Sequence, residues 1–323
     1  MVQRINTTVF PDPEALARNL ERVTRHLARA AGPGGRALEL VHAPGGATAV
    51  RDLAGHWWRG FPFLEGSHSV ERASSPAQAE RLARAFGGFL SDVGELDPAE
   101  LAVVIHGFHD LAARLAALED AEQRDPLGRA GGTAPELDSA RALAARIDLA
   151  AEAALPLRVV HNDCKLNNLL VDAASGAPLC VVDLDTVMPG RALYDFGELV
   201  RSAASTAAED EPDASRMDFD FELFAALARG FVAGARGGLA PEEIRSLALA
   251  GPRMALENGV RFLADHLEGD RYFPVHRPGH NLDRARTQLR LAERMLDRAA
   301  ELRDRVRGLV QPRYSEHHPG DRS

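Results

Sequence analysis

Residues 158–190 read RVVHNDCKLNNLLVDAASGAPLCVVDLDTVMPG, and this stretch decides the fold of the chain. It contains two short apolar runs, each followed directly by side chains with polar oxygens, and we expect strands at 157–163 and 178–187. The residues between them, at about 169–177, are typical of a hairpin-like connection. The sequence therefore predicts two neighbouring strand ends that carry polar groups.

These polar groups have the types and spacing of a phosphoryl-transfer site. His161, Asp163 and Asn168 form H-x-D-x-x-x-x-N after the first strand, and Asp183 ends the second. Phosphoryl transfer from ATP needs a carboxylate beside the acceptor hydroxyl, and an amide and a second carboxylate that hold Mg²⁺ against the phosphates. We predict Asp163 as the catalytic base and Asn168 and Asp183 as Mg²⁺ ligands. The alternative is that these residues only form turns and caps, as Asp and Asn often do near strand ends.

Lys165 is the only lysine in a chain with 38 basic residues, and it lies two residues after the predicted base. A lysine ammonium is a compact charge that can neutralise a transferring phosphoryl group, so we predict a catalytic role for it. The alternative is an incidental lysine that points to solvent.

The part of the chain before residue 66 predicts a small β-rich lobe. A strand begins near Val2, and a helix follows with Asp12 as its N-cap, Pro13 in its first position and a stop at Gly32. Three further β-like stretches lie at 37–43, 46–52 and 55–64.

The part after residue 66 is mainly helical by its apolar spacing. The segment 98–122 is predicted as one helix that carries His106 and His109, each expected to be a satisfied core or surface histidine. The other predicted helices are at 76–93, 136–154, 192–206, 218–235, 241–267 and 283–308, with a surface loop at 125–135. A β-rich lobe followed by an α-rich lobe is an α+β layout.

Composition sets limits on the partners. The net charge of −9 argues against a general nucleic-acid binder or a polybasic membrane partner. Two cysteines, Cys164 and Cys180, are too few for a disulfide framework, and we find no signal segment and no apolar run long enough to span a membrane. We therefore expect a cytoplasmic, monomeric enzyme with a small-molecule substrate.

The central stretch, together with QRINTTVFPD at 3–12, GFHD at 107–110 and ENGVRFLADHLEGDRYF at 257–273, resembles the aminoglycoside phosphotransferase/choline kinase superfamily. It is most similar to the branch of N-acetylhexosamine 1-kinases, and the resemblance covers residues 2 to about 305. The DLDTVMPG and RFLADHLEGDRYF blocks are specific to that branch.

The resemblance implies a protein-kinase-like two-lobed α+β fold. A small nucleotide-binding lobe would span 1–66 with its hinge at about 60–66, a large catalytic and substrate lobe would span 67–310, and a disordered tail would span 311–323. The resemblance also implies ATP-dependent, Mg²⁺-dependent phosphorylation of the anomeric hydroxyl of GlcNAc or GalNAc.

Several site residues are implied by the resemblance alone. Arg261 and Tyr272 match positions that contact the sugar, and Asp185 and Thr186 lie where they would assist the metal or the sugar. The hinge segment, with Phe63 and Glu65, would meet the adenine.

The sequence departs from the family at its start. The relatives carry a glycine-rich loop ahead of the segment that matches VQRIN, and nothing in this sequence takes that place; we expect a start codon placed too far downstream rather than a true truncation. The strand lysine of many kinases is replaced here by Gln3. Two alternatives stay open: an aminoglycoside or other small-molecule hydroxyl kinase, and a truncated non-catalytic pseudokinase that acts as a binding module.

Overall fold

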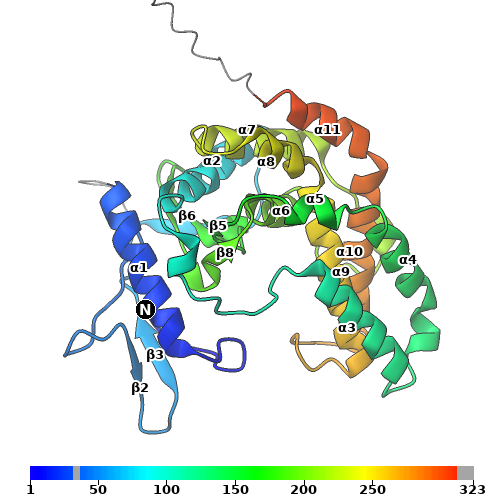
Figure 1. Ribbon diagram of the computed structural model, residues 1–323, viewed down its shortest axis with the longest axis horizontal. Coiled ribbons are helices and arrows are strands. Elements are labelled where there is room, and N and C mark those ends of the chain that lie inside the picture. The colour runs from blue at the N-terminus through cyan, green and yellow to red at the C-terminus, as the bar shows by residue number, and fades with distance from the viewer. Residues whose placement is uncertain (32–36, 311–323) are drawn as a thin grey trace, which may run out of the picture.

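The structure is a computed structural model that describes residues 1–31 and 37–310. It is a mixed α+β fold in which an N-terminal sheet and one helix lie apart from a larger helical body (Figure 1). This confirms the predicted α+β, two-lobed fold class, whereas the predicted boundary at residue 66 stays a prediction. The predicted helix stop at Gly32 and the tail at 311–323 lie outside the described residues.

The N-terminal part is a three-stranded antiparallel sheet with one helix packed beside it. The strands are β1 (Val2–Arg4), β2 (Ala49–Arg51) and β3 (Trp57–Gly60), in the order β1-β3-β2. Helix α1 (Pro13–Ala31) begins where the sequence predicts, because Asp12 Oδ1 accepts the Ala15 N–H at 2.9 Å. Its apolar face joins Trp57 of β3, Phe61 just after that strand and the 101–105 segment in a hydrophobic cluster.

The predicted strand at 37–43 is wrong among its described residues. Only Val41 forms a bridge, to Gly60, and its N–H donates to the Gly60 oxygen at 2.9 Å. The edge of β3 that Val41 meets is already paired with β2, from Ala49 to Arg51, so the segment has little free strand edge to pair with.

Two further small sheets hold the central stretch. Strand β4 (Ser67–Ser69) pairs with β6 (Leu169–Asp172), which pairs with β7 (Pro178–Val181). Strand β5 (Arg158–Val160) pairs instead with β8 (Met188–Gly190). The two strands predicted from the sequence therefore belong to different sheets, and the hairpin partner of β7 is β6, within the segment expected to be a connection.

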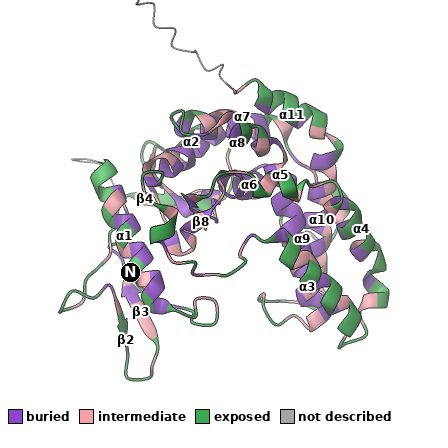
Figure 2. Cartoon of the chain, viewed as in Figure 1, coloured by how far each residue is buried: buried purple, intermediate pink, exposed green. Residues whose placement is uncertain are grey.

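The helices form the rest of the molecule. They are α2 (Pro76–Val93), α3 (Leu111–Arg124), α4 (Ala134–Ala144), α5 (Leu149–Ala153), α6 (Ala192–Ala203), α7 (Phe221–Gly234), α8 (Pro241–Ser246), α9 (Ala250–Glu268), α10 (His280–Asp297) and α11 (Ala299–Arg307). The buried residues form continuous stripes along the faces that α2, α6, α7, α9 and α10 turn toward one another (Figure 2).

The single helix predicted at 98–122 is wrong. The segment has a short 3₁₀ turn at Pro98–Glu100, then bends and a turn at 106–109, and α3 begins only at Leu111. Gly107 has a φ of 61°, and Asp110 caps α3 by accepting the Ala113 N–H at 3.0 Å. His106 and His109 therefore lie in a loop rather than on a helix.

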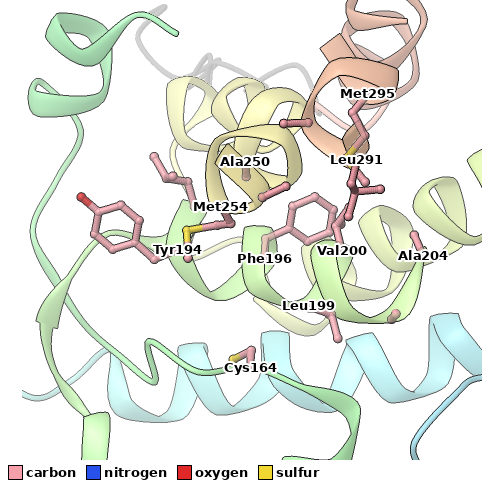
Figure 3. Close-up of a cluster of buried hydrophobic side chains, with 14 of the residues drawn as sticks. Cys164, Tyr194, Phe196, Leu199, Val200, Ala204, Ala250, Met254, Leu291 and Met295 are labelled. Carbon is pink, nitrogen blue, oxygen red and sulfur yellow. The ribbon is translucent and has the colours of Figure 1, made fainter. Parts of the chain in front are cut away.

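Helix α6 lies at the centre of the largest core. Phe196, Leu199 and Val200 extend from it among residues of α9 and α10, such as Met254 and Leu291 (Figure 3). The same cluster includes Cys164, the residue after the predicted base (Figure 3). The core thus fixes the segment that carries the predicted site.

Candidate active site

His161 connects the two halves of the predicted site. Its Nε2 lies 3.0 Å from the main-chain oxygen of Val182, and its Nδ1 accepts the Asp163 N–H at 3.3 Å. The ring is fully buried and makes edge contacts with Phe86 and Phe89 of α2. The histidine of the motif therefore holds the loop after β5 against the strand that leads to Asp183.

Further hydrogen bonds join the same two segments. The Val182 N–H donates to the main-chain oxygen of Asn168 at 2.9 Å, and Asn162 Nδ2 donates to the main-chain oxygen of Thr186 at 2.9 Å. Thr186 Oγ1 donates to the His161 oxygen at 2.7 Å. Thr186 is thus engaged with the main chain, and its predicted role at the substrate stays a prediction.

Asp163 is half-buried, and its carboxylate is contacted by two side chains, those of Asn168 and Lys165. Asn168 Nδ2 donates to the Asp163 main-chain oxygen at 2.8 Å and to its Oδ2 at 3.2 Å. The Lys165 ammonium lies 2.8 Å from Asp163 Oδ1. Because both partners donate to it, the carboxylate is held in one orientation.

Lys165 is placed by carboxylates and does not extend freely into solvent. Besides Asp163, it lies 3.9 Å from Glu198, which pairs with Arg201. Burial alone would lower the pKa of Lys165, but Glu198 and Asp163 raise it above its ordinary value. For the Glu198 carboxylate, burial has the opposite effect and would raise the pKa, yet Arg201 lowers it to about 2. The Lys165 ammonium and the Glu198 carboxylate are therefore charged near neutral pH.

The environment of Asp183 differs from that of Asp163, whose carboxylate is contacted by Asn168 and Lys165. Its backbone has a φ of 59°, and no hydrogen bond or ion pair to its carboxylate occurs within residues 1–31 and 37–310. Although the side chain is open to solvent, the protein around it limits its hydration, and this partial burial with the nearby carboxylates of Asp185 and Asp163 raises its pKa. Negative charge is thus in excess at this point.

The residues present fit a divalent cation of the Mg²⁺ type. Asn168 uses its Nδ2 to donate to Asp163, which leaves its Oδ1 as a ligand oxygen, and the Asp183 carboxylate has no competing partner in the described part of the chain. In that part, no group of three or more His, Cys, Asp and Glu side chains is arranged to hold a metal. A Mg²⁺ ion commonly takes one or two protein ligands and completes its shell with phosphates and water.

Two positioning residues were not predicted from the sequence. Asp195 of α6 is fully buried and accepts the N–H groups of His161 at 3.1 Å and Asn162 at 2.7 Å. Burial raises the pKa of Asp195, and these bonds oppose that effect. An acidic residue on the apolar face of a predicted helix was the signal available for it.

His109 is the second of these residues. It is buried, its Nδ1 lies 2.9 Å from Glu257 of α9 and its Nε2 lies 2.8 Å from the Asn162 oxygen. The expectation of a satisfied core histidine is confirmed. The His109 ring also links Glu257 of α9 to Asn162, the residue before Asp163. The position of His109 in the sequence does not by itself indicate this link.

The model of the phosphotransferase enzyme family matches residues 4–230, which is more than half of the chain and includes all of the loop and turn described above. The chain belongs to this family. The prediction that it is a phosphotransferase is confirmed.

Solved structures of phosphotransferases share its fold. An aminoglycoside phosphotransferase from Alicyclobacillus acidocaldarius has a TM-score of 0.60 at 16% identity, covering 95% of this chain and 86% of that one. The microcompartment-associated aminopropanol kinase has a TM-score of 0.53 at 17% identity, covering 96% and 87%. The ADP-bound aminoglycoside phosphotransferase APH(2'')-Ib has a TM-score of 0.51 at 13% identity, covering 88% and 85%.

In this phosphotransferase the two residues predicted to contact the sugar lie together. The Arg261 guanidinium, on α9, is 5.9 Å from the ring centroid of Tyr272, and it is also 5.3 Å from Phe273 and 5.8 Å from Phe108. Tyr272 itself is largely exposed. The group is an arginine among aromatic rings with an open side, and its residues Arg261, Tyr272 and Phe273 lie beyond the part of the chain that the family model matches.

A cavity of about 400 Å³ lies beside Asn162. It is bordered by the segment from Ile105 to Ala112 and by Met188–Arg191. Phe108 lines it and also contacts Arg261, so the cavity and the arginine–aromatic group share one wall. Its volume is within the range of small-molecule sites.

The other predicted residues lie on the side of the N-terminal sheet. Asp185 forms an ion pair with Arg59 of β3. Phe63 and Glu65 lie in the segment that connects β3 to β4, and the side chains of both are exposed. The segment's role as a hinge and its contact with adenine stay predictions.

Proposed function

We propose that this phosphotransferase transfers the γ-phosphoryl group of ATP to the anomeric hydroxyl of an N-acetylhexosamine and releases the sugar 1-phosphate and ADP. The observation that carries the proposal is the joined loop and turn, in which one carboxylate is oriented by donors and a second has no partner among the residues that the structure describes. A base and a cation ligand need these two different environments.

In the proposed reaction Asp163 accepts the proton of the sugar O1 hydroxyl as the oxygen bonds to the γ-phosphorus and the bond to ADP breaks. Asn168 and Asp183 would hold Mg²⁺, which supplies neutralisation of the phosphate charge. Lys165 keeps Asp163 oriented and adds positive charge beside it. Positioning and electrostatics account for most of the rate in such reactions.

The acceptor is proposed from the arginine–aromatic group. Arg261 lies close enough to Arg114 for the two positive charges to interact, and burial together with Arg261 lowers the pKa of Arg114. Two arginines beside aromatic rings suit a neutral sugar, whose ring can stack and whose amide oxygen can accept a hydrogen bond. They repel a polycationic acceptor.

An aminoglycoside acceptor is the second candidate, because structures of aminoglycoside phosphotransferases share the fold. A polycation needs a lining of carboxylates. Asp110, Glu152 and Arg191 line the cavity beside Asn162, and Glu152 is already paired with Arg253. This mixed lining favours the neutral sugar.

The test is a panel of acceptors with γ-labelled ATP and Mg²⁺: GlcNAc, GalNAc, other hexoses, aminoglycosides and amino alcohols. We expect label in a 1-phosphate of an N-acetylhexosamine, identified by ³¹P NMR, and an Asp163→Asn variant slower by about 10²–10⁴-fold. Turnover of an aminoglycoside alone would replace the proposed acceptor. No turnover together with no thermal stabilisation by Mg-ATP would reject the enzyme in favour of a binding module.

A further inference from the structure

Arg59 lies opposite the position from which the strand lysine is missing. In the pairing of β1 with β3, the Cα partner of Gln3 is Arg59. Directly opposed residues of an antiparallel pair extend to the same face of the sheet. Gln3 stands where many kinases carry a lysine that pairs with nucleotide phosphates. A cation is thus present on that face, but it comes from the neighbouring strand.

The contacts of Arg59 hold its guanidinium in a fixed place. Its Nε and Nη2 donate to Gln3 Oε1 at 3.3 and 3.2 Å, and Nη2 donates to Asp185 Oδ2 at 2.6 Å, while Nη1 donates to Asp185 Oδ1. The residue is 8% exposed, and its guanidinium lies 5.1 Å from the Phe61 ring. Gln3 and Asp185 therefore fix the plane of the guanidinium from two sides.

One N–H of this guanidinium has no acceptor in the part of the chain that the structure describes. Nη1 carries two N–H groups, and within the described residues it makes one hydrogen bond, to Asp185. Asp185, which binds the same nitrogen, lies two residues after Asp183, so the guanidinium is anchored to the turn that carries a predicted metal ligand. A planar guanidinium suits phosphate oxygens.

We propose that Arg59 binds the phosphates of the nucleotide in place of the strand lysine, and that Gln3 and Asp185 are the residues that position it. This rests on the ATP half of the proposed function and is independent of the acceptor. Glutamine at position 3 follows from the arrangement, because a lysine there would put two like charges directly opposite each other, whereas Gln3 Oε1 accepts hydrogen bonds from the arginine.

The experiment compares dissociation constants for adenosine, AMP, ADP and ATP, with Mg²⁺, by calorimetry. We expect Arg59→Gln to weaken ADP and ATP by about tenfold or more, since a hydrogen bond to a charged group is lost, and to leave adenosine within about twofold. The matched control is Arg4→Gln, which removes the same charge from an exposed residue on the other face of β1.

A double variant tests whether the cation can bind the phosphates from either strand of the β1–β3 pair. Gln3→Lys with Arg59→Gln exchanges the cation across the strand pair, and we expect it to recover part of the ADP affinity lost in Arg59→Gln. If Arg59→Gln fails to fold, Arg59→Lys keeps the charge without the forked donors. It is then expected to weaken ADP relative to adenosine.

The outcomes separate this inference from the proposed function. Equal binding of ADP by the wild type and the Arg59 variants, or equal losses for adenosine and ATP, would show that Arg59 only ties the sheet to the turn, and would overturn the inference. A wild type that binds no nucleotide would reject ATP as the donor and the inference with it. A wild type that binds nucleotide but phosphorylates no sugar would reject only the proposed acceptor.

Discussion

At the scale of single residues, the backbone of the site depends on two side chains that tolerate left-handed conformation. Asn162 has a φ of 65° and Asp183 a φ of 59°. Asn and Asp adopt this region more readily than other non-glycine residues. Each residue lies where the chain leaves a strand, so the conformation turns the following segment across the strand ends.

Replacing Lys165 by methionine tests whether its ammonium acts in catalysis. Methionine keeps much of the aliphatic length but leaves Asp163 without its 2.8 Å partner. We expect kcat to fall by about tenfold or more, since a charge-assisted contact is lost, with a smaller effect on the KM for ATP. Steady-state kinetics measure this, and an unchanged kcat would remove Lys165 from the mechanism.

Replacing Asp183 by asparagine is expected to abolish activity and yet to stabilise the protein free of metal and nucleotide. Asparagine tolerates the positive φ, and it removes a carboxylate whose pKa is raised by partial burial and by Asp185 and Asp163. The folded protein holds a proton on Asp183 more tightly than the unfolded chain does. The wild type therefore loses stability as the pH rises through the raised pKa.

Thermal unfolding of both proteins across a pH series measures this effect. The variant should have the higher Tm at neutral pH, and the difference should shrink as the pH falls below the raised pKa of Asp183. Asp125→Asn is the control, because Asp125 also has a positive φ, of 33°, but its carboxylate accepts the N–H groups of Arg129 and Ala130. A lower Tm for Asp183→Asn than for the wild type would contradict the account.

At the scale of elements, the closest helix contact in the core depends on glycine. A Cβ added to Gly87 of α2 would lie 2.1 Å from the Phe231 oxygen of α7, whereas one added to Gly88 would meet only the end of the Arg236 side chain, at 3.5 Å. We expect Gly87→Ala to reduce the free energy of unfolding by about 1–3 kcal/mol or more. Gly88→Ala should leave it unchanged or raise it by up to about 1 kcal/mol, through helix propensity.

Urea denaturation of the two neighbouring variants compares them under the same conditions. They differ in the packing of one methyl group and share the change in helix propensity. Equal midpoints for both variants would mean that α2 and α7 can move apart to accept the methyl group.

The elements that sequence patterns predicted are those with strong local signals. Helix α1 has its cap and proline, and α2 and α6 have long apolar faces, so they lie where they were expected. The error at 98–122 came from reading Val103, Val104 and Ile105 as part of a helical face. Gly107 and Asp110 are both visible in the sequence and argue against one continuous helix. Gly107 has a positive φ, and Asp110 caps a helix that begins at Leu111.

At the scale of the whole molecule, the predicted base and metal ligands came from spacing along the chain, but their contacts depend on pairing between distant segments. Local periodicity cannot show that β5 pairs with β8 or that β4 pairs with β6, because those choices depend on the complete fold. For the same reason the sequence did not reveal Arg59 opposite Gln3, Asp195 beneath the loop, or His109 between α9 and Asn162.

The charge of the whole chain gives the last prediction, because it separates the two candidate acceptors. A net charge of −9 attracts any polycation in dilute salt, and the attraction weakens as ions screen it. If the acceptor is a neutral N-acetylhexosamine, its KM should change by less than about twofold between low and high ionic strength, since no net charge on the acceptor is screened. The KM for Mg-ATP serves as the internal control for salt effects on the nucleotide. A KM for the preferred acceptor that rises steeply with salt would instead identify a cationic substrate and would count against the arginine–aromatic group as the sugar site.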